Sequence, residues 1–323
     1  MNTIIINSLR KLVVDIEGEN DCLEDEKEIS KNRFRIRSFK EAIRKISKLG
    51  KEIRSVEDLV GVAGIGEGIR KRVAEIIATG SLEEQPRCVP EIKHSRIQDI
   101  IGIGPKLALT LRKEHGIVSP EGLKEAIEKG TVAVSHAVSI GLKYHFGPVF
   151  YRGGIPRPEM DQIAAAIQQA ASVSKVTAMI CGSYRRQSPT SNDIDVLVFG
   201  SKGLKKIVHH LVEQGFLLDH MTHHLETLTT KYMGLCVSPT DPTVARRIDI
   251  RNIPSKSAAT AMLYFTGPAD FNRRMRQKAK EMGYKLSEYA ITQLSTSMRI
   301  DVNTEEEVFS LLNEPYIAPA DRV

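Results

Sequence analysis

The hydrophobic and polar positions of this chain follow one period in its first half and another in its second. Up to about residue 172 the apolar residues recur at helical spacing, broken by glycine turns and by a Gly/Pro cluster at 147–156. From 175 onward short apolar runs, KVTAMIC, DIDVLVF and ARRIDIRNI, are interleaved with a helical stretch at 202–214. The pattern predicts an all-helical N-terminal part followed by a mixed sheet flanked by helices. We expect the acidic tail, 301–323, to form strands and a short helix.

The basic residues are concentrated in one of the predicted helices. The whole chain has 46 Lys and Arg against 40 Asp and Glu, a formal net charge of +6. Residues 31–54 carry ten basic and two acidic side chains, whereas residues 1–30 carry three basic and eight acidic ones. A charge run by itself more often marks a solvated helix face. A phosphate-binding surface is the alternative, and neighbouring motifs favour it.

An internal repeat follows this basic helix. GVAGIGEGIRKRVAEIIATG at 61–80 resembles IIGIGPKLALTLRKEHG at 100–116, and Gly64 and Gly66 precede Gly102 and Gly104 by 38 residues. Glycines permit a tight hairpin and leave the amides at the start of the next helix open to a phosphate. Two ordinary glycine turns between helices would give the same sequence pattern. Two copies beside a basic helix favour helix-hairpin-helix DNA binding, which grips backbone phosphates without reading sequence.

Cysteine usage and hydropathy argue against several other classes of protein. No run of about 20 apolar residues is present, and the N-terminus lacks the features of a signal peptide. The cysteines Cys22, Cys88, Cys181 and Cys236 are far apart and form no CxxC pair. This spacing argues against a disulfide framework and against a thiolate zinc site. We expect an intracellular protein without a membrane span.

Paired aspartates are the first candidate for chemistry. Asp193 and Asp195 alternate with Ile194 and Val196, so the strand period puts both carboxylates on one face while the apolar residues enter the core. Asp249, in a second strand with the same alternation, could complete a site of three carboxylates. Oxygen ligands of this kind suit Mg²⁺ better than zinc. The Asp-x-Asp pattern alone is weak, because chance matches on exposed strands are common.

A glycine–serine turn just upstream strengthens this interpretation. Gly182 follows the apolar run VTAMI and would let backbone amides approach a triphosphate, Ser183 offers a hydroxyl, and Arg186 offers a charge-assisted donor. A strand, this turn, a short helix and an Asp-x-Asp strand together are typical of nucleotidyl transfer. In such reactions one metal ion activates a 3′-hydroxyl and a second stabilises the leaving pyrophosphate.

Six motifs in order resemble the family X DNA polymerases, most closely the beta type. They are GSYRR…SNDIDVLV at 182–198, TKYMG at 230–234, RRIDIR at 246–251, YFTG at 264–267, FNRRMR at 271–276 and LSEY at 286–289. The resemblance implies an α+β multidomain fold in which helix-hairpin-helix domains precede a mixed-sheet nucleotidyltransferase palm with helical flanking subdomains. It implies a lyase-like DNA-binding domain at 1–88, a second helix-hairpin-helix subdomain at 89–150, the palm at 151–260 and a nucleotide-selection subdomain at 261–323.

The resemblance also implies roles for individual residues. It makes Asp193, Asp195 and Asp249 the catalytic, metal-binding carboxylates. The implied nucleotide contacts are Gly182, Ser183, Arg186, Ser191, Asn192, Tyr264, Phe265, Gly267 and Asn272. The implied DNA contacts are Arg35, Gly64, Gly66, Gly102, Gly104, Lys231, Arg251 and Arg276. Two positions depart from the beta type, because Asn192 replaces a glycine at the triphosphate and Ala269 replaces an aspartate near the incoming base.

A further departure concerns the lyase activity of the beta type, which uses a lysine amine to form a Schiff base. The corresponding position is Arg72, whose guanidinium stays protonated and offers no free amine. In the surrounding 5′-phosphate pocket, Gly68 and Val60 stand where the family has lysines, whereas Arg35 keeps a charge. We therefore expect no lyase nucleophile, and a lyase activity that is absent or residual.

The resulting hypothesis is a DNA-directed DNA polymerase that fills short gaps in a pathway resembling base excision repair. It would use two Mg²⁺ ions, with Mn²⁺ as a substitute, and a monovalent cation at the hairpin loops is a further candidate ligand. We expect its partners to be gapped or nicked DNA and deoxynucleoside triphosphates, its state to be monomeric, and its location to be the nucleus or an equivalent replication compartment. A template-independent nucleotidyltransferase and a catalytically dead DNA-binding protein are the alternatives.

Overall fold

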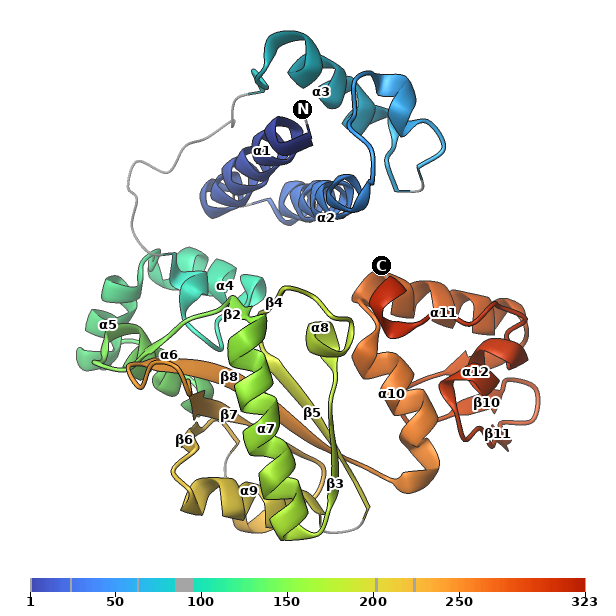
Figure 1. Cartoon of the computed structure of the whole chain (residues 1–323). Coiled ribbons are helices and arrows are strands. Elements are labelled where there is room, and N and C mark those ends of the chain that lie inside the picture. Colours follow the sequence, from blue (N-terminus) through green and yellow to red (C-terminus); the bar gives the residue numbers. More distant parts are fainter. Residues whose placement is uncertain are drawn as a thin grey trace. The chain divides into compact units, whose positions relative to one another are not determined.

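The computed structural model describes residues 2–23, 25–62, 64–84, 96–200, 203–222 and 225–322 (Figure 1). The chain forms two compact units. The first comprises Met1–Asp99 and Ile103–Val132, and the second comprises Ile100–Gly102 and Ala133–Val323. Each unit has a hydrophobic core of its own. Among the described residues, none of the helices combines the length and the apolar character needed to cross a membrane.

The first unit is helical, as the apolar spacing predicts. It contains α1 (Asn2–Cys22), α2 (Glu26–Lys48), α3 (Glu67–Thr79), α4 (Pro105–His115) and α5 (Pro120–Glu128), with short 3₁₀ turns at Val56–Leu59 and Ile97–Asp99. Asp25 caps α2 by accepting a hydrogen bond from the Lys27 amide at 2.8 Å. Leu9, Ile46 and Ile76, from three different helices, are fully buried together. The amphipathic stripes of α1, α2 and α3 therefore meet in one core.

Both glycine repeats have the same backbone geometry. Gly64 and Gly102 have φ angles of +86° and +92°, a left-handed conformation that favours glycine. Gly66 and Gly104 are the extended N-cap residues of α3 and α4, and neither end has a side-chain cap. The N-cap residue of neither helix therefore donates a side-chain partner to the first amides, which a phosphate-binding hairpin needs to keep open.

The second unit is built on a mixed sheet with helices packed against it (Figure 1). In chain order it contains α6 (His136–Phe146), β1 (Phe150–Tyr151), β2 (Ile155–Pro156), α7 (Arg157–Ser174), β3 (Thr177–Ile180), α8 (Gly182–Arg185), β4 (Thr190–Ser191), β5 (Ile194–Phe199), α9 (Gly203–Glu213), β6 (Leu217–His220), β7 (Lys231–Val237) and β8 (Val244–Ile253). The strand order is β3-β5-β8-β7-β6, with β1 also paired to β8. β5 and β8 are parallel, whereas β3 and β7 run antiparallel to them. The predicted mixed sheet is confirmed.

A buried ion pair ties the central strand to a covering helix. Arg246 of β8 is 5% exposed and forms two hydrogen bonds with Glu159 of α7, at 2.7 and 2.6 Å. Ser238 donates to the same carboxylate at 2.6 Å. Because removal of one partner would leave a buried charge, this pair holds α7 in position on the sheet. The strand sequence by itself also allows Arg246 to be a solvated edge residue, and the structure excludes that.

After the sheet, the chain forms a smaller helical and stranded part. It contains α10 (Ala258–Thr266), α11 (Ala269–Glu281), β9 (Tyr284–Leu286), β10 (Ile291–Gln293), β11 (Arg299–Ile300) and α12 (Glu305–Leu311), and ends in a 3₁₀ turn at Pro319–Asp321. The expectation of strands in the tail is wrong for its described residues, 301–322, which form only α12 and that turn as regular elements. Val308 and Phe309 of α12 are buried in the core that this helix shares with α10 and α11, so tertiary packing decided the outcome.

Candidate active site

The structure brings the three predicted aspartates to one edge of the central strands. Asp195 on β5 lies directly opposite Asp249 on β8 in the parallel register, and Asp193 immediately precedes β5. Ile194 and Ile248, their apolar neighbours, are fully buried. The alternation of each strand therefore directs the carboxylates to the face opposite the core.

The carboxylates are electrostatically unfavourable to one another. Burial, together with the negative charges of Asp193 and Asp249, raises the pKa of Asp195 to about 7. Burial also raises the pKa of Asp193, with a contribution from Asp249. Such an arrangement is stabilised by a cation, and the ligand oxygens are those that a hard divalent ion prefers.

The positive charge of Arg247 offsets part of this negative charge. Its Nη2 lies 3.0 Å from Oδ2 of Asp249, and its Nε lies 3.4 Å from Oδ1. In the described part of the chain, no group of three or more Asp, Glu, His or Cys side chains converges closely enough to enclose an ion. The chemistry of the three side chains thus fits a metal site, whereas their positions do not form a closed cage.

The glycine–serine turn lies directly against these carboxylates. Gly182, the first residue of α8, has φ +57°, and a Cβ atom there would lie 2.6 Å from Oδ2 of Asp195. Only glycine therefore allows this close approach. The Cys181 amide donates to the Asp195 carbonyl at 2.8 Å, which joins the turn to β5. Ser183 donates to the hydroxyl of Ser191 at 2.8 Å, so the two predicted phosphate-binding serines are adjacent.

The neighbouring cysteine has no role in proton transfer at neutral pH. Cys181 is fully buried and its thiol lies 3.8 Å from the sulfur of Met262. Burial raises the pKa of the thiol to about 12. The side chain therefore acts as a small apolar group beneath the turn.

Two consecutive arginines connect the turn to the C-terminal part of the unit. Arg186 donates through Nη1 to the carbonyl of Thr266, the last residue of α10, at 2.7 Å. Arg185 donates to the hydroxyl of Thr266 at 2.6 Å and forms a two-pronged ion pair with Glu305, at 2.6 and 3.2 Å. The end of α10, which carries Tyr264 and Phe265, is thereby linked to α8.

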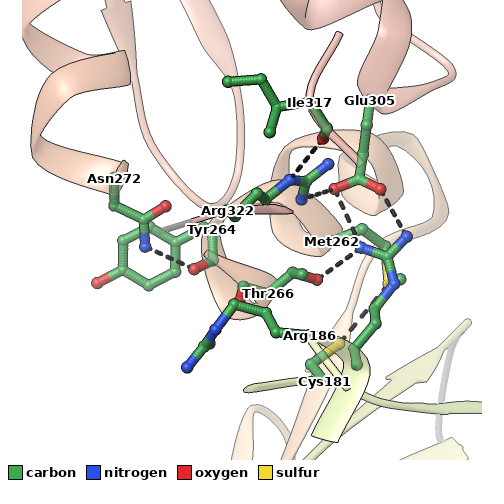
Figure 2. A network of polar contacts seen from close by, with 10 residues as sticks. Cys181, Arg186, Met262, Tyr264, Thr266, Asn272, Glu305, Ile317 and Arg322 are labelled. Atoms are coloured by element: carbon green, nitrogen blue, oxygen red, sulfur yellow. Dashed lines mark hydrogen bonds and ion pairs between the residues drawn. The ribbon is translucent and has the colours of Figure 1, made fainter. Parts of the chain in front are cut away.

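Glu305 is shared with a second arginine from the end of the chain. Figure 2 shows Arg322 and Glu305 beside Thr266 and Arg186. Arg322 has a fully buried side chain, donates to Oε1 of Glu305 at 2.6 Å and to the Ile317 carbonyl at 3.0 Å. Its guanidinium is also surrounded by the rings of Phe271, Phe309 and Tyr316. We call Arg185, Thr266, Glu305 and Arg322 the Glu305 network.

The predicted base-contacting residues form a second group next to this network. Asn272 donates to the Tyr264 carbonyl at 2.6 Å, and Arg276 lies over the Tyr264 ring at 5.4 Å from its centroid. These three side chains line part of a pocket. A Cβ atom on Gly267 would lie 2.4 Å from the ring of Phe271, so the bend between α10 and α11 requires glycine. Asn272 and Arg276 thus both contact Tyr264, and Nε of Arg276 also donates to the Asn272 carbonyl at 3.3 Å.

The remaining predicted contacts are more exposed. Lys231 begins β7 opposite Arg251 of β8, and Arg251 lies over the ring of Phe265 at 5.2 Å from its centroid. Asn192 is exposed next to Asp193. These positions leave Lys231 and Asn192 accessible to a ligand on the carboxylate side of the sheet.

In the first unit, Arg72, which the sequence analysis places at the position of a lyase lysine, is ion-paired. Arg72 donates to Glu84 at 2.5 Å, and Arg35 donates to the other oxygen of Glu84 at 2.7 Å. Lys71 is exposed and forms an ion pair with Glu67 at 3.0 Å. The only lysine adjacent to Arg72 in the sequence therefore has another partner, on the exposed face of α3.

Several residues of these sites were missed by reasoning from the sequence. They are Glu84, Arg185, Arg247, Glu305 and Arg322. Arg185 and Arg247 lie inside the motifs that carry Arg186 and Asp249. Their positive charges close to these predicted ligands were a signal in the sequence. Glu305 and Arg322 carry no local signal, since their partners are distant in sequence.

Three family models match successive parts of the chain. A helix-hairpin-helix domain matches residues 21–82, a DNA polymerase beta palm matches 154–255, and a DNA polymerase beta thumb matches 261–323. The chain belongs to the family X DNA polymerases. The family resemblance and the fold class predicted from the motifs are confirmed.

Similar family X relatives are longer than this chain. DNA polymerase lambda of Rattus norvegicus is 29% identical over 311 residues, which cover 90% of this chain and 53% of the relative. DNA polymerase lambda of Arabidopsis thaliana is 31% identical over 312 residues, covering 88% and 57%. DNA polymerase/3'-5' exonuclease PolX of Bacillus subtilis (strain 168) is 26% identical over 330 residues, covering 98% and 54%. The chain thus spans about half the length of the curated relatives it matches.

Proposed function

We propose that this protein is a DNA-directed DNA polymerase that adds deoxynucleotides to a primer 3′-hydroxyl at short gaps during DNA repair. The observation that carries the proposal is the position of Asp195 opposite Asp249, with the Gly182 turn packed against the same carboxylates. Membership of family X gives this geometry its reaction class. The proposal needs both the site geometry and the family membership, because paired aspartates on a sheet also occur without catalysis.

In the proposed reaction, Asp193, Asp195 and Asp249 would hold two Mg²⁺ ions, for which Mn²⁺ could substitute. Bound there, the ions would make the 3′-hydroxyl a better nucleophile and neutralise charge on the triphosphate and pyrophosphate. Ser183, Ser191 and the first amides of α8 would donate to phosphate oxygens, and the two serine hydroxyls already lie 2.8 Å from each other. Arg186 would exchange its contact with the Thr266 carbonyl for a phosphate oxygen.

The substrate side of the proposal rests on the helical unit and on α11. We propose that the glycine hairpins and the basic helix α2 hold the phosphates of gapped DNA, and that Arg276, Lys231 and Arg251 contact the strands near the templating base. We also propose that the hairpin loops bind a monovalent cation. The protein would act as a monomer, in the nucleus or an equivalent compartment. We also propose that the chain has four domains, at 1–88, 89–150, 151–260 and 261–323.

The lyase step of the beta type is proposed to be absent. Arg72 offers no neutral amine, and Lys71 points to another partner on the exposed face of α3. Borohydride reduction on an incised abasic duplex should therefore trap little covalent complex. Efficient trapping that disappears in Lys71→Ala would show that the nucleophile has moved to the neighbouring lysine.

A gap-filling assay tests the polymerase proposal. The full chain should extend a primer across a one-nucleotide gap, and with one nucleotide supplied at a time it should insert the base complementary to the template. The same primer without a template serves as the control. Equal extension of both primers would support a template-independent transferase, and binding without any extension would support a catalytically dead DNA-binding protein.

A further inference from the structure

The segment from Gly182 to Ser191, which carries both predicted phosphate-binding serines, contains little regular structure of its own. Its helix, α8, has four residues, and a helix this short has no stability by itself in water. Gly182 at its start and Gln187 just after it have φ angles of +57° and +58°. The left-handed conformation of Gln187 costs conformational free energy, because this residue has a Cβ atom. Contacts from outside the 182–191 segment must therefore hold it in place.

One end of the segment is held by the backbone at the start of α7. β2 pairs with β4 so that Ile155 lies opposite Ser191 (Figure 1). The Arg157 amide, at the first residue of α7, donates to the Pro189 carbonyl at 3.0 Å. These bonds fix the Ser191 end of the segment and leave the α8 end to side chains.

The side chain of Arg157 holds the α8 end. Its guanidinium lies over the ring of Tyr184 at 4.0 Å from the centroid, and its Nη1 donates to the Tyr184 carbonyl at 2.8 Å. Its Nε donates to Oδ1 of Asp161 at 3.1 Å, and the Tyr184 hydroxyl donates to the same oxygen at 2.9 Å. Arg157, Asp161 and Tyr184 thus form a closed triangle, which we call the Arg157 clamp.

The clamp acts where the chain leaves α8. The Tyr184 carbonyl that accepts from Arg157 also accepts from the Gln187 amide at 2.9 Å, so one oxygen joins α7 to the left-handed residue. An exposed ion pair alone contributes little to stability, and the Arg157 and Asp161 side chains are 34% and 55% exposed. The stacked ring and the carbonyl contact add to that pair, and they orient the guanidinium toward α8.

We propose that Arg157 is a positioning residue for the triphosphate of the incoming nucleotide, and that it acts through the 182–191 segment without touching the substrate. This inference rests on the proposed function in taking Ser183 and Ser191 as triphosphate contacts. The clamp keeps the two hydroxyls adjacent before the nucleotide arrives, so less order has to be created on binding. Loss of Arg157 therefore weakens nucleotide binding, while DNA binding through the helical unit stays nearly unchanged.

The test measures nucleotide affinity apart from catalysis. The full chain is bound to a gapped duplex whose primer ends in a dideoxynucleotide, and a fluorescently labelled complementary deoxynucleotide is titrated by anisotropy in Mg²⁺. Arg157→Gln should raise the nucleotide Kd about fivefold, with the gapped-DNA Kd within about twofold. Inorganic pyrophosphate, used as a competitor that has phosphates but neither base nor sugar, should weaken by a similar factor.

Three further variants separate positioning from general stability. Arg157→Lys keeps the charge but lacks the planar set of donors, so it should recover part of the affinity and stay about twofold weaker than the parent protein. Tyr184→Phe keeps the ring beneath Arg157 and loses only the contact with Asp161, so its effect should also be smaller. Lys129→Gln is the matched control, because it breaks another exposed i,i+4 ion pair, with Glu125 on α5, and should leave the nucleotide Kd unchanged.

Several results would overturn the proposal. They are an unchanged nucleotide Kd in Arg157→Gln, a weaker nucleotide with unaltered pyrophosphate competition, an equal loss in Lys129→Gln, and a fall in Tm as the sole effect. Should Arg157→Gln not fold, Arg157→Lys takes its place, and an unchanged nucleotide Kd in that variant has the same meaning.

Insertion on an extendable primer separates this inference from the polymerase proposal. A chain that shows the expected change in Kd but inserts nothing would fail as a polymerase and still support the role of Arg157. Normal insertion with an unchanged Kd would do the reverse. Absence of nucleotide binding by the parent protein would overturn both.

Discussion

Asp249 has one negatively charged neighbour and one positively charged neighbour. Asp195 faces it across the strand pair, and Arg247 holds its carboxylate from the same strand. Asp249→Ala should lower nucleotide addition by several orders of magnitude, in keeping with the loss of metal activation of a hydroxyl. Gapped-DNA affinity should stay within about twofold, because the carboxylate offers no favourable contact to a phosphate.

Single-turnover gap filling and a binding titration measure these two effects. Asp301→Ala is a suitable control, since this aspartate is 88% exposed on the other part of the unit. Activity of Asp249→Ala within about tenfold of the parent protein would contradict the metal-ligand assignment.

Asp195 makes the metal-free protein sensitive to pH. Its pKa is raised in the folded state from an ordinary value of 3.8 to about 7, so ionising it costs folding free energy. The penalty is absent below about pH 4, where the carboxyl is protonated in both states, and complete above about pH 7. In EDTA, the parent protein should lose more thermal stability between pH 5 and pH 8 than Asp195→Asn, by several degrees in Tm.

Thermal unfolding at both pH values, with and without Mg²⁺, measures this difference. Added Mg²⁺ should restore the parent protein at pH 8 more than it restores the variant. An identical pH response in the two proteins would show that burial of Asp195 has no energetic consequence.

At the scale of elements, the helix α8 has only four residues and is positioned by its neighbours. The Glu305 network joins it to α10 and α12, and Arg322 supplies one of the two cations that pair with Glu305. Arg322→Ala should reduce kcat/KM for gap filling about tenfold or more, because a buried carboxylate loses a partner and the Arg186–Thr266 contact shifts. The larger part should be a rise in KM for the nucleotide.

Arg322→Lys is the rescue variant, since it keeps the charge while removing the planar pair of donors. It should recover part of the nucleotide affinity. A fall in Tm with unchanged KM in Arg322→Ala would mean that the network only stabilises the fold.

At the scale of the whole molecule, the distribution of charge predicts how the protein meets DNA. If α2 and both hairpins bind phosphates, the logarithm of gapped-DNA affinity should fall linearly with the logarithm of salt concentration, with a slope of about −0.9 per neutralised phosphate. Arg33→Gln, on the exposed face of α2, should reduce that slope by about one phosphate without changing sequence preference. A flat salt response, or strong discrimination between duplex sequences, would contradict this mode of binding.

Local chemistry was readable from the sequence by itself. The period of two placed Asp193 and Asp195 on one face, because strand geometry alternates side chains whatever the strand packs against. Gly64 and Gly102 marked turns with positive φ, since glycine is the residue that adopts them at little cost. The order of motifs was enough to identify the family, because a motif is a local string.

Only the tertiary structure decided which of these local features meet. Arg185 and Glu305 are 120 residues apart, and Arg35 and Glu84 are 49 apart, so neither pair has a signal in any sequence window. The tail illustrates the same limit, because Val308 and Phe309 of α12 are buried in a core formed with residues of α10 and α11, which precede them by about 30 residues or more. Pairings of this kind depend on the free energy of closing long loops and of burying charged groups. This free energy is a property of the folded molecule and not of any single segment.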